Sequence, residues 1–192
     1  MIEFSHVSLS YGKQKVLTDI HFQIAAGEFV ALIGGNGAGK STLMQLTNGL
    51  LKPSAGRVMV AGLDTKTSRT SQLAQKVGFL FQNPDRQICK NTIAEEILFG
   101  LRCIGLSDAE QQQHLVETLS RFQLDGTQDP FTLSRGQRQK VALAAVLAAQ
   151  PDVLLLDEPT TGLDYQECTA MMTEIAALHQ QGTTVLMVSH DM

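Results

Sequence analysis

Residues 34–41 limit most strongly what this chain can fold into. They read Gly-Gly-Asn-Gly-Ala-Gly-Lys-Ser and fit the pattern G-x-x-x-x-G-K-S/T. A continuous apolar run at residues 29–33 precedes them, and an amphipathic helical pattern follows from Lys40. Such a run is typical of a buried central strand, and glycines permit the turn that points successive N–H groups at phosphate oxygens. Strand, glycine-rich turn and helix in this order predict a phosphate-binding loop.

The loop predicts a nucleotide and Mg²⁺ as ligands. The ammonium of Lys40 would reach the β- and γ-phosphates, and the hydroxyl of Ser41 would be a ligand of Mg²⁺. The N-terminus of the following helix would add its dipole. On this motif alone the chain could be a kinase, a GTPase or a motor. The residues expected to contact the nucleotide here are Gly34, Gly35, Asn36, Gly37, Ala38, Gly39, Lys40, Ser41 and Thr42.

Two carboxylates form the second half of the predicted site. The apolar run at residues 154–156 leads into Asp157 and Glu158, at the end of a strand where parallel sheets bind ligands. Asp157 would hold Mg²⁺ through water, and Glu158 would polarise the attacking water as general base. An Asp-Glu pair after a strand is by itself more often a turn or a helix cap. The assignment therefore depends on the phosphate loop.

Alternating strand and helix patterns predict an α/β fold with a mostly parallel core sheet. Residues 2–11 and 20–24 alternate in hydrophobicity and indicate an N-terminal antiparallel β part, with a bulge near Ser5 and His6. We predict a single domain over residues 1–192, in which the core comprises residues 1–82 and 151–192.

Residues 83–150 are expected to form an inserted helical subdomain. Apolar residues recur there at helical spacing. Thr92 and Ser107 are each followed three positions later by a glutamate, which is the spacing of a capping box.

Composition and charge exclude several classes of protein. The formal charge of −4 offers no basic field for nucleic acid. The longest apolar run, residues 141–149, is far shorter than the ~20 residues that span a bilayer, and the N-terminus does not resemble a signal peptide. Three cysteines without metal-type spacing favour a reducing, cytoplasmic environment. Any attachment to a membrane is expected to run through a partner.

Residues 133–137, Leu-Ser-Arg-Gly-Gln, distinguish between families that share the phosphate loop. The segment resembles the signature L-S-G-G-Q of ATP-binding-cassette (ABC) ATPases. Further residues resemble marks of that family in the same order along the chain. They are Tyr11 (adenine stacking), Gln82 (Mg²⁺ and the attacking water), residues 162–164 (the loop that faces the opposite subunit) and His190 (the γ-phosphate).

This resemblance implies an ATPase that works as a head-to-tail homodimer or heterodimer. Ser134, Gly136 and Gln137 would contact the γ-phosphate of the ATP that the other subunit binds. Ser134 and Gln137 also have the spacing of a capping box, so Ser134 is expected to cap a helix in either case. Arg135 departs from the signature, and an arginine would cost free energy there if the position required a positive φ.

Residues 82–87, Gln-Asn-Pro-Asp-Arg-Gln, indicate a branch of the family. They resemble the Q-N-P-D-x-Q segment of energy-coupling-factor ATPases, which power uptake of vitamins or of cobalt and nickel ions. The resemblance implies integral membrane subunits as partners, a groove in the helical subdomain for a membrane coupling helix, and a place on the inner face of the cell membrane. The alternative is an ABC ATPase of DNA repair, chromosome organisation or translation. The segment is also compatible with ordinary turn chemistry.

Members of the family usually continue past the position of His190. The chain is therefore expected to lack the usual C-terminal part. We expect apolar surface near residues 183–188 to be partly exposed as a result.

Overall fold

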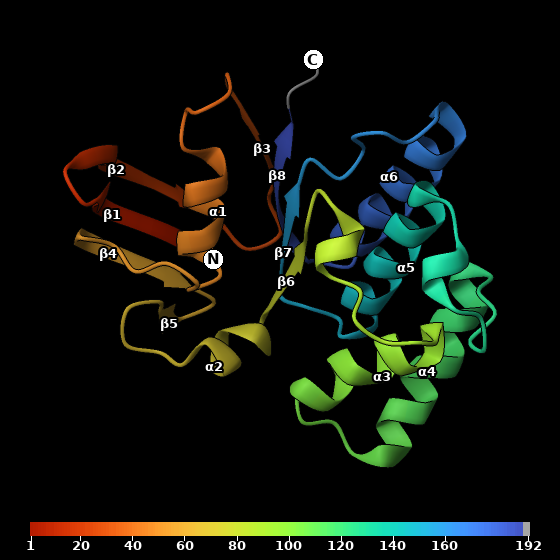
Figure 1. The fold of residues 1–192 in the computed structure, drawn as a ribbon. Helices are drawn as coiled ribbons and strands as arrows, with labels where there is room; N and C mark the ends of the chain where they lie inside the picture. Colours follow the sequence, from red (N-terminus) through yellow and green to blue (C-terminus); the bar gives the residue numbers. More distant parts are fainter. Residues whose placement is uncertain (190–192) are drawn as a thin grey trace.

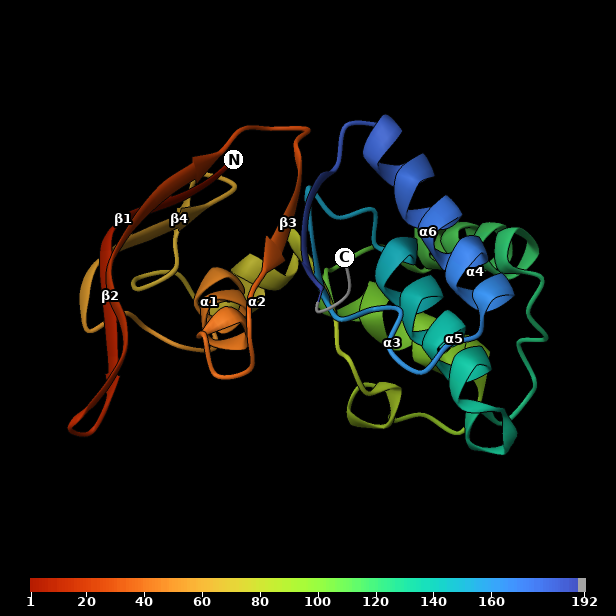
Figure 2. The same cartoon turned by 90° about the horizontal axis from the view of Figure 1, so that it is seen from above.

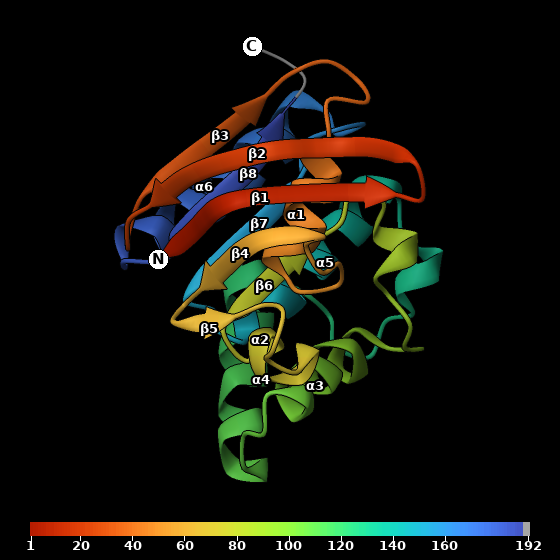
Figure 3. The same cartoon turned by 90° about the vertical axis from the view of Figure 1, so that its left-hand side faces the viewer.

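Two four-stranded sheets organise residues 1–189, which are the residues that the computed structural model describes. The N-terminal sheet is antiparallel, as expected, and has the strand order β2-β1-β4-β5. Figure 3 looks onto this sheet, with helix α1 behind it. Its strands are β1 (Ile2–Tyr11), β2 (Gln14–Ile24), β4 (Ala55–Val60) and β5 (Leu63–Asp64).

The predicted bulge in β1 is present. The strand register shifts between Phe4 and Val7, where His6 has a φ of 52°. Asp19 on β2 has the same φ, and its carboxylate lies 2.8 Å from the His6 ring. On the other side, Gly56 of β4 packs so closely against the His6 carbonyl that a Cβ would not fit. The bulge therefore runs across three strands of the sheet.

The second sheet is parallel and carries the site. Its strand order is β3-β8-β7-β6, and all neighbouring strands are parallel. No two neighbours are therefore joined by a tight hairpin. Because all four strands point the same way, their carboxyl ends meet at one edge, where α/β proteins bind ligands. The strands are β3 (Phe29–Ile33), β6 (Val77–Leu80), β7 (Val153–Asp157) and β8 (Thr184–Ser189).

The helices form two layers, one on each face of the parallel sheet (Figures 1 and 2). Helices α1 (Lys40–Thr47) and α2 (Thr70–Ala74) lie between the two sheets, and one apolar core fills this space. A second core lies between the parallel sheet and the helices on its other face. Those helices are α3 (Ile93–Cys103), α4 (Asp108–Phe122), α5 (Arg135–Ala148) and α6 (Tyr165–Gln180), with the short 3-10 helices η1 (Pro84–Arg86) and η2 (Pro130–Thr132).

Side chains cap the helices where the sequence predicts them to. The hydroxyls of Thr92, Ser107 and Ser134 each accept a hydrogen bond from a backbone N–H at the third position of the following helix. At Ser107 and Ser134 the reciprocal contact is also formed, so both are complete capping boxes. Within residues 1–189, no helix has both the length and the apolar character needed to cross a bilayer.

Two expectations about burial are wrong. Strand β3 is an edge strand of the parallel sheet, not a central one, and 58% of Ile33 is exposed. Strand β8 lies between β3 and β7, so Val185, Leu186 and Val188 are fully buried instead of exposed. An apolar run shows that a strand packs on a core, but the order of strands depends on the crossover connections.

Candidate nucleotide-binding site

The predicted phosphate loop forms a cavity at the carboxyl edge of the parallel sheet. The loop leaves β3 at Ile33 and enters α1 at Lys40. The cavity has a volume of about 320 Å³ and brings the loop together with Glu158, which is distant in sequence. Its lining consists of Val16, Asn36, Gly37, Ala38, Gly39, Lys40, Ser41, Thr42 and Glu158.

The loop has its shape because two glycines take a left-handed conformation. Gly37 has a φ of 80° and Gly39, at the N-cap of α1, a φ of 89°. A Cβ on Gly39 would also lie 2.8 Å from a methyl carbon of Leu17 on β2, so the position excludes side chains for two reasons. No other atoms lie within 4 Å of a Cβ built on Gly37, which leaves open space over the loop.

The side chain of Lys40 folds back over the loop. Its ammonium donates hydrogen bonds to the carbonyl oxygens of Gly34, at 2.6 Å, and of Gly35, at 3.0 Å. The cation therefore lies directly above the backbone where phosphate oxygens are expected. Charge-assisted hydrogen bonds to phosphate are among the strongest that a lysine forms.

Glu158 stands where β7 ends, beside the neighbouring strand β6. Gln82 follows the end of β6, and its amide donates a hydrogen bond of 2.6 Å to the Glu158 carboxylate. The Thr161 hydroxyl donates to the same oxygen at 3.3 Å. Glu158 itself has a φ of 50°, and its N–H donates to the Val188 carbonyl on β8. Several contacts thus fix the backbone and the carboxylate of the proposed general base.

The side chains available for Mg²⁺ all offer oxygen, which that ion prefers. They are the Ser41 hydroxyl, the Asp157 carboxylate at the end of β7, and the Gln82 amide. Within residues 1–189, no group of three or more His, Cys, Asp or Glu residues could hold a metal by itself. This donor set fits a Mg²⁺ ion that arrives with phosphate oxygens and keeps several waters.

Besides the signature residues, five predicted site residues that the structure describes do not line this cavity: Tyr11, Gly34, Gly35, Gln82 and Asp157. Tyr11 ends β1, is 51% exposed, and is absent from the cavity lining; its stacking on adenine remains a prediction. His190 lies outside the described residues. The structure adds Val16, an apolar residue on β2 that the sequence did not suggest. The alternating pattern predicts a strand only at residues 20–24, but β2 begins at Gln14 and so includes Val16.

The signature residues lie away from the cavity of their own chain. Ser134 is exposed and caps α5, Gly136 is buried in the first turn, and neither they nor Gln137 line the phosphate-loop cavity. A Cβ on Gly136 would overlap a carboxylate oxygen of Glu167, so the Glu167 side chain would have to move to admit it. Gly136 is helical and does not have a positive φ.

Arg135 causes no backbone strain. It is the first residue of α5 and is not among the described residues with a positive φ, so the predicted cost does not arise. Its guanidinium lies against Gly162, whose φ is 78°; a Cβ there would come within 2.8 Å of Arg135 Nη1. The arginine thus packs on the loop that, by resemblance, faces a partner subunit.

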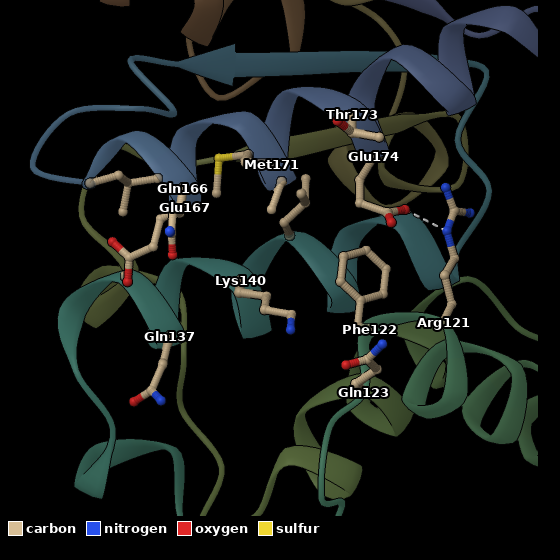
Figure 4. A pocket seen from close by; sticks show the side chains of 14 residues that line it. Arg121, Phe122, Gln123, Gln137, Lys140, Gln166, Glu167, Met171, Thr173 and Glu174 are labelled. Carbon is tan, nitrogen blue, oxygen red and sulfur yellow. Dashed lines mark hydrogen bonds and ion pairs between the residues drawn. The ribbon is translucent and has the colours of Figure 1, made fainter.

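A larger cavity, of about 560 Å³, lies between α4, α5 and α6 (Figure 4). Phe122, Leu143 and Met171 supply apolar surface, and an ion pair of 2.6 Å between Arg121 and Glu174 closes one side. It contains no run of loop N–H groups comparable to residues 34–41. The phosphate chemistry therefore identifies the smaller cavity as the candidate site.

Comparison with known protein sequences points to one family. The family model described as ABC transporter matches residues 17–161. The chain is 46% identical to the ABC transporter ATP-binding protein TTE1589 of Caldanaerobacter subterraneus. That match covers 93% of this chain and 32% of TTE1589. It is 40% identical to the energy-coupling factor transporter ATP-binding protein EcfA of Methanothermobacter thermautotrophicus, over all of this chain and 63% of that protein. The chain spans 32% to 39% of the length of the first three relatives.

Solved structures agree with this result. The cbiO1 protein of Clostridium perfringens, described as part of the ABC transporter complex cbiONQ, is 33% identical with a TM-score of 0.87. The match covers 99% of this chain and 78% of that one. The ATP-binding cassette MJ0796, described as dimeric with ADP and Pi in a post-hydrolysis state, is 30% identical with a TM-score of 0.86, over 100% of this chain and 88% of that one.

Proposed function

Because this chain belongs to the ABC transporter family of ATP-binding proteins, we propose that it binds MgATP, hydrolyses it and powers a membrane transporter. One observation carries the proposal: Glu158 lines the same cavity as Lys40 and Ser41. A phosphate cradle and a candidate general base therefore face the same space. A glycine-rich turn with a purely structural role would not require a carboxylate there.

Each residue has a defined task in this proposal. The loop N–H groups and Lys40 bind and orient the β- and γ-phosphates. Ser41, Asp157 and Gln82 would hold Mg²⁺, which would neutralise charge on the phosphate oxygens. Glu158 orients the attacking water and accepts its proton. Gln82 holds the Glu158 carboxylate through the 2.6 Å hydrogen bond and restricts its rotation.

A second subunit would complete the site. Ser134, Gly136 and Gln137 do not line the cavity of their own chain, yet Ser134 is exposed at the capped N-terminus of α5. A helix N-terminus favours negative charge, so the partner's γ-phosphate is a suitable ligand for it. The dimeric state described for MJ0796 supports a dimer, either of two copies or with a related ATPase.

The transporter that we propose is an importer of the energy-coupling-factor type, for a vitamin or a transition-metal ion. The segment at residues 82–87 supports this, as do the likeness to EcfA and to cbiO1. The membrane subunit would contact the helical subdomain and hold the ATPase at the inner face of the cell membrane. Phe99 on α3 is 42% exposed there, with the Lys90 ammonium 4.2 Å from its ring centre.

Copurification from detergent-solubilised membranes tests this assignment. We expect the tagged chain to retain an integral membrane protein, and Phe99→Ser to lose it because the substitution removes apolar contact area. Leu50→Ser is the matched control, since Leu50 is 56% exposed beyond the end of α1, outside the helical subdomain. Retention of ribosomes or DNA in place of a membrane protein would contradict the assignment.

A further inference from the structure

Arg138 connects two segments to which the proposed function gives separate roles. Its Nη1 donates a hydrogen bond of 2.5 Å to the carbonyl oxygen of Leu133, the residue before Ser134. Its Nε lies 2.8 Å from a carboxylate oxygen of Asp85. The Arg138 side chain is 19% exposed, whereas the Asp85 side chain is 53% exposed, so water reaches this pair from the Asp85 side. One guanidinium therefore contacts both Leu133, which directly precedes Ser134, and the segment at residues 82–87.

Two glutamines join the same parts of the chain. The Gln87 amide donates to the Ala142 carbonyl on α5 at 3.3 Å and accepts from the Phe81 N–H at 3.2 Å. The Gln139 amide donates to the Phe81 carbonyl at 3.1 Å, and only 2% of Gln139 is exposed. The segment that follows β6 is thus attached to α5 at both of its ends. A displacement of this segment would carry α5 with it.

The contact between Asp85 and Arg138 depends more on the attraction between opposite charges than on a well-aligned hydrogen bond. The Arg138 Nε makes no hydrogen bond of acceptable geometry, although it is buried and lies 2.8 Å from the carboxylate. Asp85 is not needed to form its own 3-10 helix, because Asn83 caps that helix through the Asp85 N–H. Neutralising Asp85 should therefore weaken the link and leave the local backbone in place.

We propose that Arg138 is a positioning residue that ties Ser134 to Asp85. A shift of the segment at residues 82–87 would move Arg138, and through the Leu133 carbonyl it would move Ser134 toward or away from the partner's nucleotide. The proposed role of Ser134 rests on the proposed function above. The mechanical link itself is a property of a single chain and can be tested without ATP.

Hydrogen–deuterium exchange of the full chain tests the link. In Asp85→Asn we expect the amides of residues 134–137 to exchange roughly five-fold faster or more, because the cap of α5 opens more often. Asp85→Glu keeps the charge and should restore protection. Asp64→Asn is the matched control, because it neutralises another Arg–Asp pair of 2.8 Å, with Arg57 in the antiparallel sheet, and should leave residues 134–137 unchanged.

Turnover then tests the consequence. In Asp85→Asn and in Arg138→Gln, kcat should fall several-fold while the Kd for ATP stays within about two-fold, because the phosphate loop is intact. Unchanged exchange of residues 134–137 in Asp85→Asn would overturn the proposed link, whether or not ATP is hydrolysed. Absence of ATP binding by the unmutated chain would overturn the proposed function instead, and the exchange result would still decide the link.

Discussion

Glu158→Gln is expected to slow ATP hydrolysis by roughly 100-fold to 1,000-fold, because the amide cannot accept the proton of the attacking water. The substitution keeps the shape of the side chain. The Gln82 amide, now 2.6 Å from a carboxylate oxygen, can still donate to the amide oxygen of the substituted side chain, in a weaker bond without charge assistance. ATP should therefore still bind. Because the bound ATP is not hydrolysed, a stable ATP-bound dimer should accumulate.

Steady-state turnover and gel filtration with ATP measure the two effects. Glu117→Gln is the matched control, because Glu117 is exposed on α4 and pairs only with the Gln113 amide among the contacts described. It should hydrolyse ATP at the rate of the unmutated chain. If Glu158→Gln also hydrolysed ATP at that rate, Glu158 would not be the general base.

Lys40→Ala is expected to weaken ATP binding by about 100-fold, which corresponds to about 2.7 kcal/mol. The substitution removes the cation that lies over the loop, and with it the charge-assisted contacts to the β- and γ-phosphates. The fold should persist, since among residues 1–189 the Lys40 ammonium donates to the Gly34 and Gly35 carbonyls, which water can reach once the side chain is gone.

Titration with a fluorescent ATP analogue measures this loss. Lys66→Ala serves as the control because it also removes one positive charge, from an exposed position outside the cavity. Its affinity should stay close to that of the unmutated chain. An unchanged affinity in Lys40→Ala would mean that residues 34–41 do not hold the phosphates.

Features that depend on neighbouring residues could be predicted from the sequence. The phosphate loop and the cap at Ser134 each arise from a few adjacent residues whose conformations are restricted locally. The bulge at His6 is visible in the sequence as a change of phase in the alternation, although contacts across three strands form it. The end of α1 is harder to predict. The apolar pattern that begins at Lys40 extends to Leu50, but α1 ends at Thr47 and Leu50 is 56% exposed.

Contacts between distant residues could not be predicted in the same way. The bond between Gln82 and Glu158 spans 76 positions and exists because β6 and β7 are neighbours in the sheet. The pair of Asp85 and Arg138 depends likewise on the packing of η1 against α5. The sequence shows that each of these residues is polar. Which partner it contacts depends on the strand order and on helix packing.

A mixing experiment tests most directly the claim that two chains share each site. Lys40→Ala damages the phosphate loop and Ser134→Arg damages the signature, so each variant alone should be inactive, in a chain whose unmutated form hydrolyses ATP. In a mixed dimer, one site combines the intact Lys40 of one chain with the intact Ser134 of the other. We predict that mixing restores part of the hydrolysis. No activity in the mixture, with mixed dimers shown to form, would contradict the shared site.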